Sequence, residues 1–236
     1  MNIALIIAGG SGQRMNQDIP KQFINVRNKP VIIYTLEVFQ NHPDLDAIYV
    51  VCIDGWHEIL RAYAKQFNIT KLAGIVSGGE TGQASIYNGL VVIKEDFADE
   101  DIVLVHDAIR PMVSEEIISD NIAVCRLHGS AVTSISCAEA LLETESKVFS
   151  NSIYDREKIM RTQTPQAFPL GKLAKVHKEA LRRGITNSVA SCTLMIELGH
   201  QVHFSAGSEK NIKLTTIDDI EIFKALLSTK NSDWLK

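Results

Sequence analysis

The first ten residues constrain the fold most, because an unbroken apolar run there ends directly in glycines. Residues 3–8 are all apolar and are followed by Gly9 and Gly10. A strand with apolar side chains on both faces is typical of a parallel sheet that is covered by helices on both sides. Glycines after such a strand let the backbone bend sharply and bring its N–H groups close to a ligand. The pattern therefore predicts an α/β fold with a phosphate-binding loop.

Two basic side chains, Arg14 and Lys21, accompany this glycine loop. An ordinary turn between a strand and a helix is one alternative, since such turns also use glycines. A dinucleotide-binding fingerprint requires a third glycine where Met15 stands, and a P-loop requires a Gly-Lys-Ser or Gly-Lys-Thr sequence that this loop does not have. A basic glycine loop with neither motif suits a nucleotidyltransferase, which binds a nucleoside triphosphate.

The composition indicates a single domain that spans residues 1–236. The chain is 45% apolar and 22% charged with a net charge of -4, which suits a globular protein and argues against a nucleic-acid-binding function. Its four cysteines are widely spaced and form no zinc-binding pattern. No apolar stretch reaches the length of a transmembrane helix. We expect a cytoplasmic enzyme with no nucleic-acid or membrane partner.

Strand and helix signals alternate along the chain, which predicts a mostly parallel sheet with helices on both faces. The predicted strands cover residues 3–8, 47–53, 73–77, 101–106, 131–136 and 201–205. Helices are predicted after Pro30, over 55–66, around 86–93, after Ser114, around 173–184, over 189–198 and from Thr216. Ser114 and the Thr216–Asp219 pair are predicted helix caps.

This alternation breaks at about residues 138–161, where polar and apolar residues alternate without a helical period. A segment of this length inside a compact domain is usually functional or part of an interface. One interpretation is a protruding β-arm that pairs with a second subunit. The other is an ordinary surface hairpin.

A second candidate site follows the predicted strand that ends near residue 106. Asp107 lies there, at the carboxyl end of a strand, where open α/β sheets bind ligands. A carboxylate at such a place suits Mg²⁺, which takes oxygen ligands and bridges to substrate phosphates. The alternative is an Asp107–Arg110 ion pair that orders the turn. We interpret His106 as a structural histidine.

Three further features carry weaker signals. Gly78 and Gly79 lead into a helix that contains Ser85, and this turn is suited to contact a base or ribose. Residues 163–166 read Gln-Thr-Pro-Gln and are interpreted as a rigid bend in a pocket wall. Arg156, Lys210 and Lys213 are isolated basic residues whose role depends on the fold.

Six motifs in this order resemble those of the sugar-phosphate cytidylyltransferases. They are Ala-Gly-Gly-x-Gly-x-Arg-Met, Pro-Lys-Gln, Gly-Gly with a helix serine, His-Asp-Ala-x-Arg-Pro, Gln-Thr-Pro-Gln and Asn-Ile-Lys. The resemblance runs from residue 3 to about 225. It implies a Rossmann-like fold, a homodimer built around an extended arm, and a reaction of CTP with a polyol phosphate that needs Mg²⁺ and releases pyrophosphate.

The resemblance also implies roles for individual residues. It implies nucleotide contacts from Ile7, Ala8, Gly9, Gly10, Gly79, Glu80, Ser85 and Ala108, stabilisation of charge at the α-phosphate by Arg14 and Lys21, a metal ligand in Asp107, and positioning of the acceptor phosphate by Arg156 and Lys213.

Three places depart from the members of this family that act on 2-C-methyl-D-erythritol 4-phosphate. Gly82 stands where they carry an arginine, Glu139 where they carry a threonine, and residues 190–193 where they carry Asp-Glu-Ala-Ser. These departures weaken the assignment to that acceptor, and Glu139 departs from the ribitol-phosphate members as well. We favour ribitol 5-phosphate, a precursor for teichoic acid or capsule synthesis, as the acceptor. The alternatives are 2-C-methyl-D-erythritol 4-phosphate, an isoprenoid precursor, another polyol phosphate, and a nucleotide-binding module without catalysis.

Overall fold

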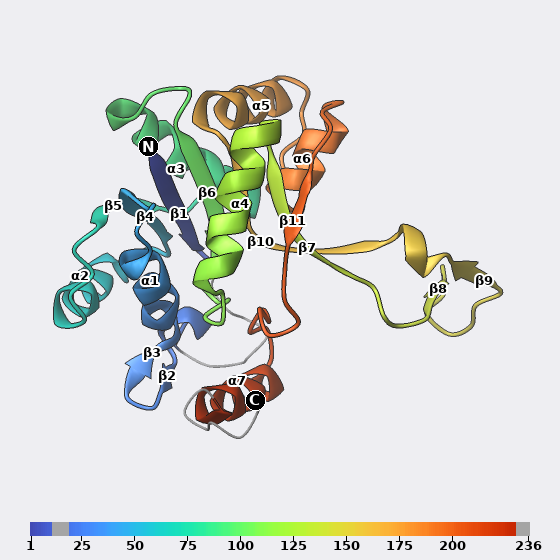
Figure 1. The fold of residues 1–236 in the computed structure, drawn as a ribbon, viewed down its shortest axis with the longest axis horizontal. Coiled ribbons are helices and arrows are strands. Elements are labelled where there is room, and N and C mark those ends of the chain that lie inside the picture. The colour runs from blue at the N-terminus through green and yellow to red at the C-terminus, as the bar shows by residue number, and fades with distance from the viewer. Residues whose placement is uncertain (11–18, 230–236) are drawn as a thin grey trace.

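A seven-stranded sheet forms the centre of the computed structural model, which describes residues 1–10 and 19–229 (Figure 1). Its strands are β1 (Asn2–Ala8), β4 (Ala47–Cys52), β5 (Leu72–Ser77), β6 (Ile102–Asp107), β7 (Ala131–Ser136), β10 (Met160–Pro169) and β11 (Phe204–Ala206), in the spatial order β11-β7-β10-β6-β1-β4-β5. Neighbouring strands are parallel except around β10, which is antiparallel to both β6 and β7. The predicted α/β fold with a mostly parallel sheet is confirmed.

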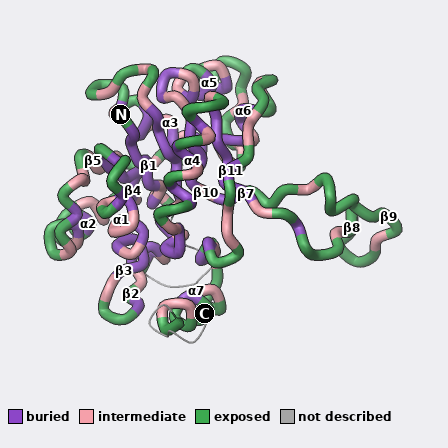
Figure 2. The backbone as a smooth tube through the Cα atoms, viewed as in Figure 1, coloured by how far each residue is buried: buried purple, intermediate pink, exposed green. Residues whose placement is uncertain are grey.

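Helices cover both faces of this sheet, as the apolar first strand predicted. Ala4 and Ile6 of β1 belong to one core with helices α1 (Val31–Asn41), α2 (His57–Gln66) and α4 (Glu115–His128). Ile3 and Leu5 belong to the opposite core with α3 (Gly82–Asp96), α5 (Leu170–Arg182) and α6 (Ser191–Glu197). The central strands β1, β4 and β6 are accordingly almost completely buried (Figure 2).

Each predicted strand and helix is present, with its ends shifted by up to four residues. The predicted caps are also present: Ser114 Oγ accepts the N–H of Ile117 at 3.4 Å, and Asp219 accepts the N–H of Thr216 at 2.7 Å. The latter begins α7 (Ile217–Thr229), which packs through Phe223 against Tyr34 of α1. Within the described residues, no helix is long and apolar enough to span a membrane.

The prediction that residues 163–166 form part of a pocket wall is confirmed, since Gln163, Thr164 and Gln166 line a cavity, but the sequence did not predict that these residues lie in the sheet. They lie within β10, a ten-residue strand between β6 and β7. The prediction missed this strand because Pro165 has no N–H to donate to a ladder and its neighbours are polar. The strand tolerates them through a register shift between Thr162 and Gln166, where the Thr164–Pro165 peptide is cis.

The segment predicted to break the pattern forms an arm that protrudes from the domain (Figure 1). It consists of a small hairpin, β8 (Leu141–Glu143) with β9 (Ser152–Tyr154), followed by a 3-10 turn, Arg156–Lys158. The remaining short elements, a 3-10 turn at Lys21–Phe23 and the hairpin β2 (Asn25–Val26) with β3 (Lys29–Pro30), lie between β1 and α1. The arm is thus confirmed as a protruding hairpin, and its pairing with a second subunit stays a prediction.

Candidate active site

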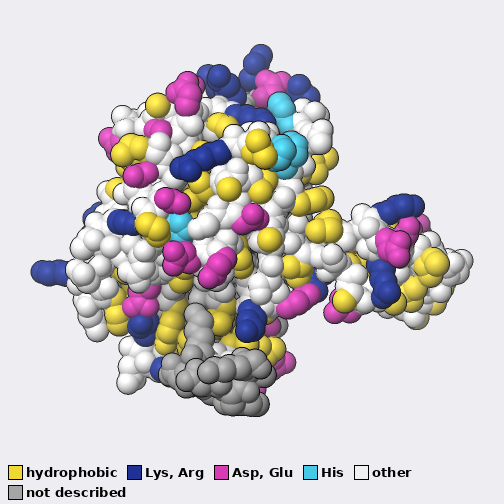
Figure 3. Space-filling model, in the orientation of Figure 1, with side chains coloured by type: hydrophobic (Ala, Val, Ile, Leu, Met, Phe, Trp, Pro, Cys, Tyr) yellow, Lys and Arg dark blue, Asp and Glu magenta, His cyan; other side chains and the backbone are white. Residues whose placement is uncertain are grey.

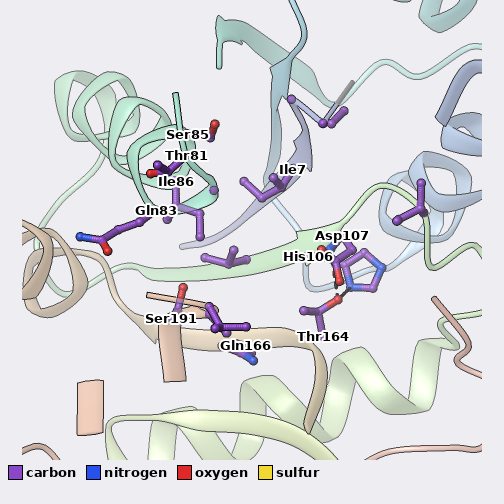
Figure 4. A pocket seen from close by; sticks show the side chains of 18 of the residues that line it. Ile7, Thr81, Gln83, Ser85, Ile86, His106, Asp107, Thr164, Gln166 and Ser191 are labelled. Atoms are coloured by element: carbon purple, nitrogen blue, oxygen red, sulfur yellow. Dashed lines mark hydrogen bonds between the residues drawn. The ribbon is translucent and has the colours of Figure 1, made fainter. Parts of the chain in front are cut away.

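A cavity of about 580 Å³ opens at the carboxyl ends of β1 and β6, beside the N-terminus of α3 (Figure 4). This is the edge at which open α/β sheets bind ligands. The structure brings most of the predicted site residues to this one cavity. The predicted residues that line it are Ile7, Ala8, Gly9, Gly10, Lys21, Gly79, Glu80, Ser85, Asp107 and Lys213.

The glycine loop is held in place by a side chain to which the sequence analysis gave no role. The buried Gln22 donates from Nε2 to the carbonyl of Ala8 at 2.7 Å and to that of Gly10 at 3.1 Å. A Cβ added at Gly9 would lie 3.4 Å from Ser85 Oγ, so this position brings the loop close to α3. The Pro-Lys-Gln motif was the available signal for Gln22. Arg14 lies outside the described residues.

The turn into α3 is built by local hydrogen bonds. Thr81 Oγ1 accepts the N–H of Ala84 at 3.1 Å and so caps the helix. Ser85 Oγ accepts the N–H of Gly79 at 3.0 Å. A Cβ at Gly79 would lie 2.6 Å from that of Ala84, so packing alone requires glycine there. Ser85 therefore shapes the turn as well as facing the cavity.

Asp107 lies between two positive charges. Its Oδ2 is 3.2 Å from Arg110 Nε, and Lys213 Nζ is 3.1 Å from its carboxylate. Burial alone would raise the pKa of Asp107, but the charges of Lys213 and Arg110 outweigh burial and hold that pKa below its ordinary value. The predicted Asp107–Arg110 pair therefore exists, and it leaves the carboxylate ionised at the cavity wall.

Asn211 explains how Lys213 reaches a carboxylate 106 residues away in the sequence. Its carbonyl accepts from Arg110 Nη1 at 2.7 Å. Its fully buried side chain donates to the carbonyl of Thr164 at 2.9 Å and to Gln163 Oε1 at 3.2 Å. Within the Asn-Ile-Lys motif only the lysine had a predicted role, and Thr164 had none.

The donor groups present fit Mg²⁺. Within the described residues, no group of three or more His, Cys, Asp or Glu side chains is placed to hold a metal ion by itself. Mg²⁺ does not need such a group, since it is usually bound by one or two carboxylates together with substrate phosphates and water. Asp107 offers a partly exposed, ionised carboxylate beside the glycine loop. The predicted metal role of Asp107 stays a prediction.

Comparison with known proteins identifies the family. The family described as 2-C-methyl-D-erythritol 4-phosphate cytidylyltransferase (IspD) matches residues 2–229. The chain belongs to this family. The resemblance to cytidylyltransferases seen in the six motifs is thereby confirmed, and by family the chain is a nucleotidyltransferase.

Individual relatives of this cytidylyltransferase align with nearly the whole chain. A ribitol-5-phosphate cytidylyltransferase from Lacticaseibacillus paracasei is 43% identical over 98% of this chain and 99% of its own. A 2-C-methyl-D-erythritol 4-phosphate cytidylyltransferase from Clostridium novyi is 35% identical over 96% of each. The crystal structure of the Francisella tularensis 2-C-methyl-D-erythritol 4-phosphate cytidylyltransferase superposes with a TM-score of 0.77 at 30% identity, covering 95% of this chain and 99% of that one.

Two predicted site residues do not line the cavity. Ala108 is buried, and its backbone bonds to Ile7 and Thr35 tie β6 to β1 and α1. Arg156 lies on the exposed arm, where its Nη1 donates to the carbonyl of Ala138 at 2.8 Å. Glu139, one of the departures from the family pattern, lies 3.8 Å from Arg161 at the base of the arm.

Proposed function

We propose that this protein transfers the cytidylyl group of CTP to ribitol 5-phosphate. A phosphate oxygen of the acceptor attacks the α-phosphorus of CTP, the bond from that phosphorus to the β-phosphate bridging oxygen breaks, and CDP-ribitol and pyrophosphate result. The observation that carries the proposal is the single cavity in which the glycine loop, Lys21 and the Asp107–Lys213 pair meet. The acceptor is supported by relatives named ribitol-5-phosphate cytidylyltransferase at 38–43% identity, against 33–35% for those named for 2-C-methyl-D-erythritol 4-phosphate.

The chemistry requires charge stabilisation rather than a general base. A phosphate monoester has its second pKa near 6, so the attacking oxygen is already ionised at neutral pH. Within the described residues, neither histidine that lines the cavity suits base catalysis. Burial lowers the pKa of His106 to about 3 and that of His177 to about 4. Catalysis then rests on positioning and on positive charge near the α-phosphate.

The cavity residues divide into three roles under this proposal. Lys21, with Arg14 from outside the described residues, stabilises charge on the α-phosphate. Lys213 positions the acceptor phosphate. The nucleotide is bound by the glycine loop and by the turn into α3, through Ile7, Ala8, Gly9, Gly10, Gly79, Glu80 and Ser85, with Ala108 in the adjoining backbone.

Asp107 is the residue that would hold Mg²⁺. When bound, the ion would neutralise phosphate charge on CTP. The protein's own contribution is to keep the Asp107 carboxylate ionised and aimed into the cavity through Arg110 and Lys213.

A homodimer is part of the proposal. Arg156 is predicted to bind the acceptor phosphate, but it lies on the arm and does not line the cavity of its own chain. The arm also exposes apolar side chains that a second copy would cover (Figure 3). Those more than half exposed are Leu142, Val148, Phe149, Ile153 and Tyr154. We therefore infer that each arm completes the site of the other subunit.

Pyrophosphate release from CTP and Mg²⁺ with a panel of acceptors tests the proposal. We expect ribitol 5-phosphate to give the highest kcat/KM. A higher value for 2-C-methyl-D-erythritol 4-phosphate would instead assign the alternative acceptor. CTP binding without product from any acceptor would support the non-catalytic alternative and contradict an enzyme. The location expected for this activity is the cytoplasm, and the four free, buried cysteines suit such a reducing compartment.

A further inference from the structure

His106 is a buried side chain to which the proposed function gives no role. It is the last but one residue of β6 and is completely inaccessible to solvent. Its ring packs against Phe39 of α1, with ring centroids 5.0 Å apart. The next residue in the chain is Asp107. The sequence predicts a structural role for His106, yet both of its ring nitrogens bond to residues of the site.

The hydrogen-bond partners of His106 define its protonation. Nε2 lies 3.3 Å from the carbonyl of Arg110, and a carbonyl only accepts, so Nε2 carries a proton. The ring is completely buried and, among the described residues, its nitrogens bond only to this carbonyl and to the Thr164 hydroxyl, so the ring is neutral and Nδ1 has a free lone pair. Thr164 Oγ1, 3.0 Å away, therefore donates to Nδ1 (Figure 4).

Thr164 continues this chain of hydrogen bonds to the site. Its Oγ1 also accepts the backbone N–H of Asp107 at 3.1 Å. His106 thus holds both ends of the turn 107–110, one end through Thr164 and the other directly through the Arg110 carbonyl. The same turn is closed by the N–H of Arg110 on the Asp107 carbonyl at 3.1 Å. Each donor in the chain has one acceptor, so the arrangement is directional.

We propose that His106 is a positioning residue for the cytidylyl transfer: through Thr164 and the Arg110 carbonyl it sets the turn from which Asp107 and Arg110 reach the site. The inference rests on the proposed function. Asp107 and Arg110 form an ion-paired group with Lys213, and Arg110 also binds the Asn211 carbonyl. A shift of this turn would therefore displace the predicted metal ligand and the predicted acceptor lysine together.

The central experiment is a double-mutant cycle between His106 and Thr164. Thr164→Val keeps the shape of the side chain but removes the hydroxyl, whereas Thr164→Ser keeps the hydroxyl. His106→Gln places a donor near Arg110 but offers Thr164 no ring nitrogen. We expect Thr164→Val and His106→Gln each to lower kcat by roughly 30-fold while KM for CTP changes less than about 3-fold, because misplaced groups act on the transition state.

The double variant separates the proposal from a direct contact between Thr164 and substrate. Because Thr164 and His106 act together, the kcat of the double variant should be no more than about 3-fold lower than that of the less active single variant. Thr164→Ser should stay within about 3-fold of the wild type, since it keeps the hydroxyl. Multiplied losses, on the order of 900-fold, would assign Thr164 a separate contact with substrate and overturn the proposal.

Thr133→Val is the matched control for general damage to β10. Thr133 is buried on β7 and donates to the carbonyl of Pro165, next to Thr164, at 2.7 Å. We expect it to lower the melting temperature but to leave kcat within about 3-fold of the wild type, because the turn 107–110 is untouched. An equal loss of kcat in Thr133→Val would overturn the positioning role.

A spectroscopic measurement tests the geometry without relying on turnover. In ¹⁵N-histidine-labelled protein, His106 should show a protonated Nε2 and an unprotonated Nδ1, and the Nδ1 resonance should move in Thr164→Val but not in Thr164→Ser. A proton on Nδ1 would overturn the inference. An inactive wild type with every acceptor would contradict the proposed function instead, whereas an active wild type with an unaffected Thr164→Val would contradict this inference alone.

Discussion

The cavity edge of the sheet and the protruding arm hold their predicted functional side chains in opposite ways. At the cavity, Gln22, Asn211 and Thr164 each make two or more hydrogen bonds that fix the backbone around the site. On the arm, Arg156 is exposed and donates one described bond, to Ala138. The arm also lacks a core of its own, since its hairpin strands are almost entirely exposed.

The difference indicates that the cavity edge is organised within one chain, whereas the arm needs a second surface to be organised. Buried hydrogen bonds in low-dielectric surroundings hold one arrangement. An isolated two-stranded hairpin is marginally stable in water and gains order by packing on something else. Four predictions, in decreasing order of the expected effect, test this difference between the cavity and the arm.

Lys21→Ala should have the largest effect. Lys21 lies on the cavity and is proposed to stabilise charge on the α-phosphate. Removing such a donor should lower kcat by at least roughly 100-fold. Steady-state pyrophosphate release measures the loss, with Lys178→Ala, an exposed lysine of α5, as the control. Near-normal turnover in Lys21→Ala would remove this residue from its proposed role.

Arg156→Ala tests whether the arm serves its own chain or a neighbour. We expect a KM for the acceptor phosphate that is about 10-fold higher, because the charge that positions this phosphate is lost. Mixing Arg156→Ala with Lys21→Ala subunits should then restore activity, up to about a quarter of wild type for random exchange in a two-fold dimer. An equimolar mixture that is no more active than its components would place Arg156 in the site of its own chain.

Phe149→Ser tests the arm as an interface. Phe149 is 72% exposed, so its replacement should change the free energy of unfolding of an isolated subunit by no more than about 0.5 kcal/mol. In a dimer that buries this side chain, the same change should raise the dissociation constant by roughly 10-fold. Sedimentation velocity over a concentration series measures it, with Leu127→Ser on α4 as the control. A wild-type monomer at all concentrations would refute the dimer.

Asp219→Ala tests the capping of α7, the helix that follows the Lys213 loop. Burial alone would raise the pKa of Asp219, but hydrogen bonds from Thr215 and Thr216 outweigh it and lower that pKa. Losing this cap should cost about 1 kcal/mol of unfolding free energy at pH 7. Because the folded pKa is the lower one, the contribution is complete above the ordinary pKa of aspartate and is lost as pH falls through the folded value.

Urea unfolding at pH 7 and at pH 3 measures this last effect. The difference in the free energy of unfolding between the wild type and Asp219→Ala should be smaller at pH 3 than at pH 7. At pH 3 the carboxyl of Asp219 in the unfolded chain is protonated. Asp218→Ala, at the exposed neighbouring position, is the control and should show little change at either pH. A difference that grows at low pH would contradict the assigned cap.

The sequence predicted the sheet, the helices and most cavity residues because these depend on local patterns. Residues 3–8 specify a strand buried on both faces whatever their partners are. The predicted strands and helices follow from the spacing of apolar residues and from the residues that cap helices. The prediction failed at β10, because Pro165 and its polar neighbours satisfy their backbone groups through residues distant in sequence. No local pattern encodes such partners.

The six motifs were sufficient to identify the family, and the apolar periodicity was sufficient to predict an α/β sheet with a glycine loop at the end of its first strand. The pairing of Lys213 with Asp107, and the bonds of His106 to Thr164 and Arg110, could be seen only in the folded protein. These contacts join residues that are far apart in the sequence or are set by the fold around them. Backbone periodicity is set by neighbours a few residues apart, whereas these contacts form only once β10 pairs with β6 in the folded sheet.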